Sequence, residues 1–134
     1  MHRMTIQLGQ VSTSTSEALV RTHRVLIDRP EDKGGSDLGP MGGELFLAAI
    51  GGCFMSNLLA AIKARNVDVS DVRTVVVGTI EATPARFSAV EVHVEARGGS
   101  EEIERLVEVA DRGCIMMNTL RGKLDLSIRT RVLV

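Results

Sequence analysis

Residues 45–62 read LFLAAIGGCFMSNLLAAI, a stretch of eighteen residues without a charged side chain. Its length is at the lower edge of a transmembrane span, but a glycine pair and two polar residues interrupt it, and the flanking segments are typical of a soluble sheet. A helix that is hydrophobic all round is also typical of a protein core or a subunit interface. We therefore predict a long buried helix from about Gly43 to Arg65 and no membrane insertion.

The segment before this helix has the pattern of strands. Hydrophobic and polar residues alternate from Met4 to Leu8, and a second β-rich run extends from Ala18 to Asp28. The polar residues Ser12–Ser16 predict a turn between them. Glycine and proline are frequent in 29–43, which predicts a long loop, and loops of this length in a compact domain are often functional.

The segment after the helix alternates between strand and helix patterns. A hairpin is predicted over 72–82 and 86–97, then a helix that begins at Ser100, a helical turn over 114–121 and a last strand over 124–132. This order predicts an α+β fold with a mainly antiparallel sheet, in a single domain spanning residues 1–134. Because one sheet face covers only one side of the apolar helix, we also expect a homodimer.

Composition excludes several classes of function. The chain carries 16 basic and 17 acidic residues, and its only aromatic residues are three Phe. Nucleic-acid-binding proteins usually carry a basic surface with aromatic residues for stacking, so no nucleic-acid partner is expected. The N-terminal residues are too polar for a signal peptide, which favours a cytoplasmic location.

Motifs for metal, nucleotide or serine chemistry are missing. The histidines and cysteines have no paired ligand spacing, so no metal site is predicted. Gly34 and Gly39 have the spacing of a phosphate-binding loop, but Pro40 and Met41 occupy the positions of its lysine and hydroxyl residue. No nucleophilic serine lies in a G-x-S-x-G context.

Cys53 and Cys114 remain as candidates for chemistry. They are either small buried hydrophobic residues or a redox pair in which one thiolate is oxidised and the other condenses with it to a disulfide. Cys114 lies at the predicted start of a helical turn, where free backbone N–H groups favour an anion. Burial in the apolar helix is expected to raise the pKa of Cys53, which would then need a neighbouring cation to ionise.

Two blocks centred on these cysteines carry a family resemblance. Residues 39–53, GPMGGELFLAAIGGC, resemble the OsmC/Ohr signature, in which a Pro/Gly loop precedes a Glu-Leu-Leu-Leu-Ala-Ala run and a Gly-Cys pair. Residues 110–125 resemble the second cysteine region of that family. The order of elements agrees along essentially the whole chain. The resemblance implies an OsmC-like fold and an intertwined homodimer with a cysteine pair at each of two interfacial sites.

The resemblance also implies an activity in the oxidative stress response. It predicts a thiol-dependent peroxidase that reduces organic hydroperoxides or hydrogen peroxide, with Cys53 as the nucleophile and Cys114 as the resolving thiol. An external dithiol, such as a lipoylated protein, would then reduce the disulfide. No cofactor is implied, because sulfur carries the electrons.

The chain departs from the hydroperoxide reductases at their activating groups. Those enzymes place an arginine in the first turn, whereas Ser12–Ser16 contains none, and they place a carboxylate where this chain has Gly43. Glu44 occupies the next position, and Arg21 and Arg24 are candidate substitutes for the arginine. The chain therefore resembles the OsmC-like branch more than the hydroperoxide reductases.

Hydrophobic residues beside the cysteines are candidates for a substrate pocket. They are also candidates for the protein core, which is the commoner position for such side chains: Phe54, Met55, Met116 and Met117. Two other functions stay open. One is a non-catalytic dimer that binds a small apolar or sulfur-containing ligand in an interfacial pocket, and the other is a purely structural dimer.

Overall fold

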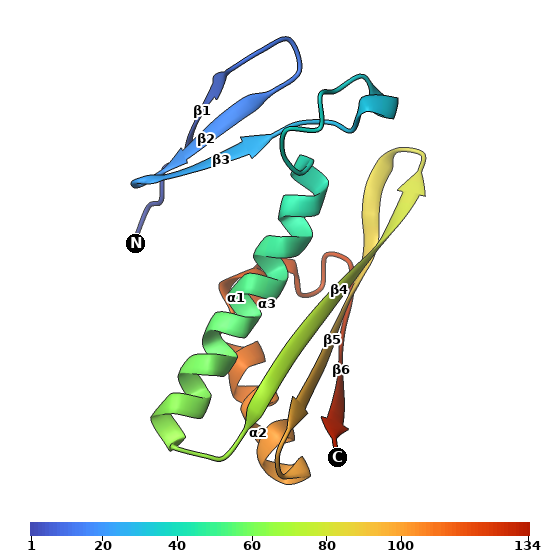
Figure 1. The fold of residues 1–134 in the computed structure, drawn as a ribbon. Helices are drawn as coiled ribbons and strands as arrows, with labels where there is room; N and C mark the ends of the chain where they lie inside the picture. Colours follow the sequence, from blue (N-terminus) through green and yellow to red (C-terminus); the bar gives the residue numbers. More distant parts are fainter. The chain divides into compact units, whose positions relative to one another are not determined.

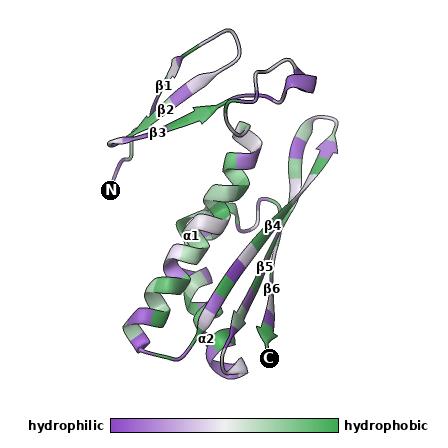
Figure 2. Ribbon diagram, viewed as in Figure 1, coloured by the Kyte–Doolittle hydropathy of each residue, from purple (hydrophilic) through white to green (hydrophobic).

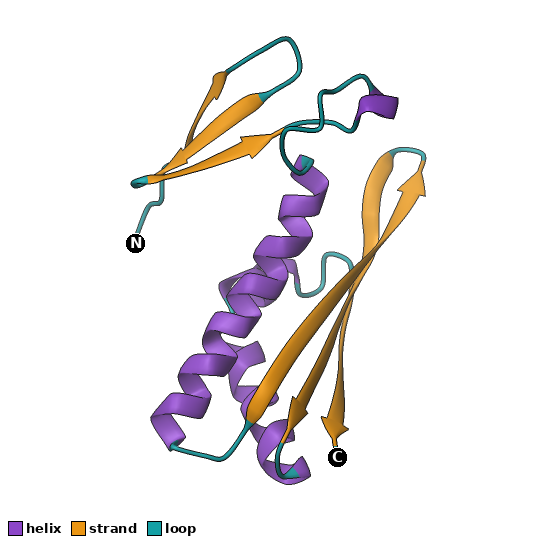
Figure 3. Cartoon of the chain, in the orientation of Figure 1, coloured by secondary structure: helices purple, strands orange, loops and turns teal.

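The computed structural model describes all residues from Met1 to Val134, and the chain forms two compact units. The first unit is Met1–Phe46 and the second is Leu47–Val134. Figure 1 labels the elements, and Figure 3 distinguishes helices, strands and loops. Helix α1, Gly42–Arg65, begins in the first unit and continues through the second.

The first unit contains a small antiparallel sheet. Strands β1 (Gln7–Gln10), β2 (Ser16–Val20) and β3 (His23–Ile27) pair in chain order, and the short 3₁₀ helix η1 (Glu31–Lys33) follows. The prediction of one continuous strand over 18–28 is wrong. Arg21 has a φ of 55°, a left-handed conformation that turns the chain back and divides the run into β2 and β3.

The loop after β3 is organised around the buried carboxylate of Asp28. The carboxylate accepts hydrogen bonds from the Thr15 hydroxyl at 2.8 Å and from the backbone N–H groups of Arg29, Ser36 and Leu38. Burial raises the pKa of Asp28, but the hydrogen bonds from Thr15, Arg29 and Leu38 outweigh it and lower the pKa to about 2. The middle of the predicted loop is thus held by hydrogen bonds to the end of β3.

Helix α1 buries one of its sides in the protein core. The buried residues Ile50, Phe54, Leu58 and Ala61 follow one another at intervals of three or four residues, whereas Leu59 is 50% exposed. Hydrophobic residues predominate along the helix (Figure 2). By length and composition α1 is capable of crossing a membrane, criteria that core helices of soluble proteins also meet.

The sheet of the second unit has the order β4-β5-β6. Strands β4 (Ser70–Ala82) and β5 (Ala85–Arg97) form the predicted antiparallel hairpin. Strand β6 (Asp125–Leu133) pairs with β5 in parallel, so the sheet is mixed. Alternate β5 residues are buried on one face: Val90, Val92, Val94 and Ala96.

Helices cover this buried face of the sheet. Gly51 of α1 lies against β4, where a Cβ atom would come within 2.8 Å of Val76 Cγ2. Helix α2 (Ser100–Gly113) packs against β6 and buries Ile103, Leu106, Val107 and Ala110. Helix α3, Ile115–Leu120, follows after the single residue Cys114. The predicted α+β class is confirmed, with α1, α2 and α3 at the expected positions.

Candidate functional site

The two cysteines lie next to each other in the second unit. The thiol of Cys114 donates a hydrogen bond to Cys53, with the two Sγ atoms 3.2 Å apart, and both cysteines are free. The residues are 61 positions apart in the sequence, so the packing of α1 against the α2–α3 segment brings them together. Cys114 is completely buried, and Cys53 is partly exposed.

The position of Cys114 follows from the break between α2 and α3. Its backbone is extended, with φ −82° and ψ 116°, and it serves as both the C-cap of α2 and the N-cap of α3. Its carbonyl oxygen accepts the hydrogen bond from Asn118 N at 3.0 Å. The next backbone N–H groups belong to the first turn of α3 and have no partner within that helix. They are therefore available to a neighbouring acceptor.

These backbone groups act on the thiol of Cys53. Burial raises the pKa of Cys53, but the backbone N–H of Met116, the thiol of Cys114 and the backbone N–H of Ile115 together lower it below its ordinary value. Hydrogen bonds to a thiolate stabilise the charged form, and the thiolate is the nucleophilic form of cysteine. The site therefore makes Cys53 easier to ionise than an ordinary cysteine.

The opposite holds for Cys114. Burial raises its pKa, and so does the adjacent Cys53, while the backbone N–H of Met117 opposes the change without cancelling it. These shifts contradict our expectations that burial raises the pKa of Cys53 above its ordinary value and that the helical start favours a thiolate at Cys114. The need of Cys53 for a neighbouring cation stays a prediction. The N–H groups of α3 hydrogen-bond to the thiol of α1, which approaches from another helix, and sequence position alone gave no indication of this packing.

Side chains around α3 hold this short helix in place. Asn118 Nδ2 donates to the carbonyl oxygen of Arg112 at 2.9 Å, which ties α3 back to the end of α2. Arg121 forms an ion pair with Asp111 at 2.7 Å, joining the other end of α3 to the same helix. These contacts fix the N–H groups of Ile115 and Met116 relative to Cys53.

The candidate pocket residues fall into different environments. Phe54 and Met117 are buried in the core, and Met116 is half-buried. Met55 lies two residues from Cys53, about 200° around the helix at 100° per residue, so it points to the other side of α1. The four residues therefore do not form one wall beside the thiols.

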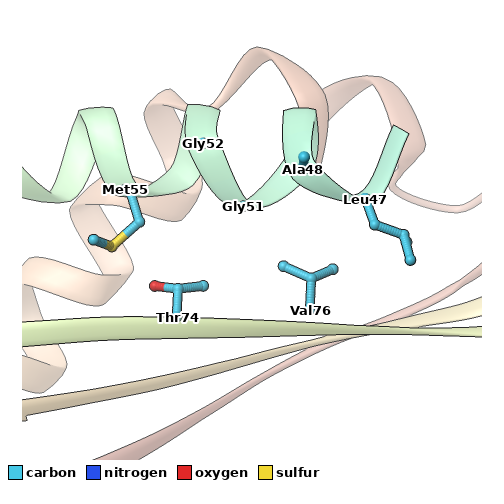
Figure 4. Close-up of a pocket in the computed structure, with 7 residues that line it drawn as sticks. All are labelled: Leu47, Ala48, Gly51, Gly52, Met55, Thr74 and Val76. Carbon is cyan, nitrogen blue, oxygen red and sulfur yellow. The ribbon is translucent and has the colours of Figure 1, made fainter. Parts of the chain in front are cut away.

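Met55 instead lines an open groove between α1 and β4 (Figure 4). The groove has a volume of about 400 Å³, and its lining is mostly apolar, with Leu47 and Val76 among its residues. Thr74 also lines the groove, and its hydroxyl oxygen is buried and has no hydrogen-bond partner. A buried hydroxyl without a partner is uncommon, so the groove combines an apolar wall with one free polar group.

The candidate activating residues lie in the first unit, where two of them contact neighbouring residues and the third is exposed. Arg24 is 67% exposed at its side chain and forms an ion pair with Glu17 at 2.7 Å. Arg21 occupies the exposed turn between β2 and β3. Glu44 Oε1 accepts a hydrogen bond from the backbone N–H of Met41 at 2.8 Å, which caps the start of α1. Activation of a thiol by any of them stays a prediction.

Solved structures with the same fold cover nearly the whole chain. An OsmC-like protein from Mycoplasma pneumoniae superposes with a TM-score of 0.87 and 16% identity, over 99% of both chains. A hypothetical protein from Aquifex aeolicus gives 0.85 and 18%, over 99% of this chain and 98% of the other. An organic hydroperoxide resistance protein from Elizabethkingia anophelis gives 0.71 and 23%, over 97% and 99%.

The sequence itself matches a family model. No curated protein sequence matches this chain. The model described as OsmC-like protein matches residues 34–129, which include both cysteines and most of the second unit. The match confirms the resemblance drawn from residues 39–53 and 110–125. The chain therefore belongs to the OsmC-like protein family.

Proposed function

We propose that this protein is a thiol-dependent peroxidase that reduces organic hydroperoxides or hydrogen peroxide through Cys53 and Cys114. The observation that carries the proposal is the 3.2 Å approach of the two Sγ atoms together with their opposite pKa shifts. A two-cysteine peroxidase needs one thiol that ionises readily and a second thiol, still protonated, within reach of the first. The similarity to structures named organic hydroperoxide resistance proteins supports the same activity.

The chemistry assigns one step to each thiol. The Cys53 thiolate attacks the distal oxygen of the peroxide, the O–O bond breaks, and the alkoxide leaves as an alcohol after taking up a proton. Cys53 is then a sulfenic acid. The Cys114 sulfur attacks the Cys53 sulfur, an S–S bond forms, and the hydroxyl leaves as water. An S–S bond is about 2.05 Å long, so the sulfurs need to approach by roughly 1.2 Å.

An external dithiol completes the cycle. It reduces the Cys53–Cys114 disulfide to two thiols and is itself oxidised to a disulfide. A lipoylated protein is the reductant that the family resemblance implies, and no other cofactor is required. The same resemblance gives the protein a cytoplasmic role in the oxidative stress response.

The active form that we propose is a homodimer. Strand β4 is thirteen residues long and pairs with β5 on one side only, so its other edge offers unpaired backbone groups. Leu59 on the uncovered side of α1 is half-exposed. Both features favour a second copy as a covering partner, and sedimentation of the full chain at micromolar concentration tests this with a predicted mass of two subunits.

Turnover with a dithiol tests the enzymatic proposal. We expect the full chain to consume cumene hydroperoxide in the presence of dihydrolipoamide, and Cys53→Ser to abolish consumption. In the absence of a dithiol, Cys114→Ser should consume one equivalent and then stop, because its sulfenic acid has no thiol to condense with. Turnover that persists in Cys53→Ser, or that is absent in the wild-type protein with every dithiol offered, would contradict the proposal.

A second candidate is a binding protein for a small apolar ligand, favoured by the groove at Met55 and Thr74. The free hydroxyl of Thr74 suits a ligand with a hydrogen-bond acceptor. Thr74→Val keeps the shape of the side chain and removes the hydroxyl. If the groove binds such a ligand, the variant should lose affinity for a probe such as hexanal without losing stability. Peroxide turnover that is unchanged in Thr74→Val would separate the groove from the thiol site.

A further inference from the structure

Strand β6 forms an edge of the sheet in the second unit. It pairs with β5 alone, and its nine residues therefore offer unpaired backbone N–H and C=O groups on the other side (Figure 1). Side chains of a strand alternate between the two sheet faces. Arg129 and Arg131 thus project from one face of the strand, and Ile128 and Thr130 project from the other.

The face with Arg129 and Arg131 presents two cations along this edge. Both arginines are exposed, and neither takes part in an ion pair or a side-chain hydrogen bond, so their guanidinium groups are free. They line a hollow of about 250 Å³ with His93 and Glu95 of β5. Glu95 pairs in register with Arg131 without forming an ion pair, so it leaves both guanidinium groups available to another carboxylate.

The opposite face of the same strand is acidic. Ile128 and Thr130 line a hollow of about 460 Å³ whose other wall is α2, and that wall presents three carboxylates and one apolar side chain: Glu104, Val107, Glu108 and Asp111. Glu108 is paired with Arg112 and Asp111 with Arg121, whereas Glu104 has no ion pair. The strand edge is therefore flanked by one hollow with two unpaired arginines and by another with one unpaired carboxylate, Glu104.

We propose that the β6 edge binds an extended segment of a partner protein as an additional strand. Backbone hydrogen bonds to β6 would hold the segment, and its side chains would alternate between the two hollows. Acidic residues at every second position would meet Arg129 and Arg131, and the residues between them, aliphatic or basic, would enter the hollow beside Val107 and Glu104. The partner is therefore recognised by alternating charge along an extended chain.

A synthetic peptide provides the direct test on the full-length chain. The probe has seven residues and blocked ends, with glutamate at odd positions and valine and lysine alternating at even positions. Its glutamates can therefore face Arg129 and Arg131, and its other residues the second hollow, whether it pairs with β6 in parallel or antiparallel. We expect saturable changes in the backbone amide resonances of β6 and slower hydrogen exchange along its edge. A peptide of the same composition with the alternation scrambled should bind at least several-fold more weakly.

Two variants and one modified peptide decide between recognition and general charge attraction. The double variant R129Q/R131Q should weaken binding by roughly two- to tenfold, as expected for a pair of exposed ion pairs. Arg105→Gln, which removes an exposed α2 arginine outside both hollows, should leave affinity unchanged. N-methylation of every peptide group should abolish binding, because it removes the backbone donors on both edges of the peptide.

The outcomes that would overturn the proposal are equally specific. Binding that does not saturate at millimolar peptide would mean that the edge charges only prevent pairing with other strands. Equal affinity for the scrambled peptide, or for the N-methylated one, would mean that no strand is added. Unchanged affinity in R129Q/R131Q would place the peptide elsewhere on the protein.

Discussion

Cys114 donates a hydrogen bond to Cys53, with the two Sγ atoms 3.2 Å apart. The pKa of Cys53 is lowered from its ordinary value, and the pKa of Cys114 is raised. The asymmetry arises because the N–H groups at the start of α3 stabilise an anion on α1, while Cys114 is buried beneath them. The activating arginine of the hydroperoxide reductases has no equivalent in the turn at Ser12–Ser16. Backbone hydrogen bonding offers this chain another route to a reactive thiolate.

The first prediction concerns the order in which the thiols ionise. Because hydrogen bonds lower the pKa of Cys53 and burial raises that of Cys114, alkylation should reach Cys53 at lower pH. The rate of reaction with iodoacetamide, followed against pH in Cys114→Ser and in Cys53→Ser, measures each thiol separately. Cys114 reacting at the lower pH would contradict the assignment of Cys53 as nucleophile.

A second prediction tests the role of Asn118 in positioning α3. Asn118→Ala removes the hydrogen bond to the Arg112 carbonyl, so the N–H groups of Met116 and Ile115 should be held less firmly against Cys53. We expect the pKa of Cys53 to rise, with both thiols still present. Thr119→Ala is the matched control, because it removes only a hydrogen bond within α3, to the carbonyl of Ile115. An equal rise of the Cys53 pKa in both variants would show that the Asn118 hydrogen bond does not position α3.

The Asp28 carboxylate makes the stability of the loop depend on pH. Its folded pKa of about 2 lies below the ordinary value of 3.8, so its contribution to stability is present above that value and is lost as the pH falls toward 2. Asp28→Asn should lower the urea midpoint at pH 6, and the difference from the wild-type protein should shrink on acidification. Asp37→Asn, at an exposed loop position, is the control and should change little at any pH. A constant difference across this range would exclude the carboxylate as its source.

Glycine at position 51 allows close approach of α1 to β4. Gly51→Ala would bring a methyl group within 2.8 Å of Val76 Cγ2, and overpacking of this kind costs about 1–3 kcal/mol, more than the roughly 1 kcal/mol gained in helix propensity. We therefore expect a lower melting temperature. Gly113→Ala, at the end of α2 with open space around it, should be neutral or stabilising. Stabilisation by both substitutions would show that the helix and the strand can move apart freely.

Local pattern predicted most of the fold, including the hairpin of β4 and β5, but not the pairing of every strand. The uncharged run gave α1 almost to its ends, and the alternation along β5 identified its buried face. The turn at Arg21 was missed because neither glycine nor asparagine marks the left-handed position. The parallel pairing of β6 with β5 was missed because it depends on the path of the chain through α2 and α3, which no local pattern encodes.

The candidate site was predicted in part. Family resemblance paired Cys53 with Cys114, and the structure brings these two residues together. The direction of their pKa shifts required tertiary packing, because the donors to Cys53 belong to a helix more than 60 residues away. Met55 could not be separated from the other apolar residues by sequence alone, since its side of α1 depends on where the sheet and α3 lie.

The most direct test of the redox pair is the intact mass and free-thiol count after one equivalent of cumene hydroperoxide, on the wild-type protein and on Cys114→Ser. We predict that the wild-type chain loses about 2 Da and both thiols as the disulfide forms. The variant should gain about 16 Da as a sulfenic acid at Cys53 that dimedone traps. Two unreacted thiols in the wild-type protein after several minutes would contradict the peroxidase account.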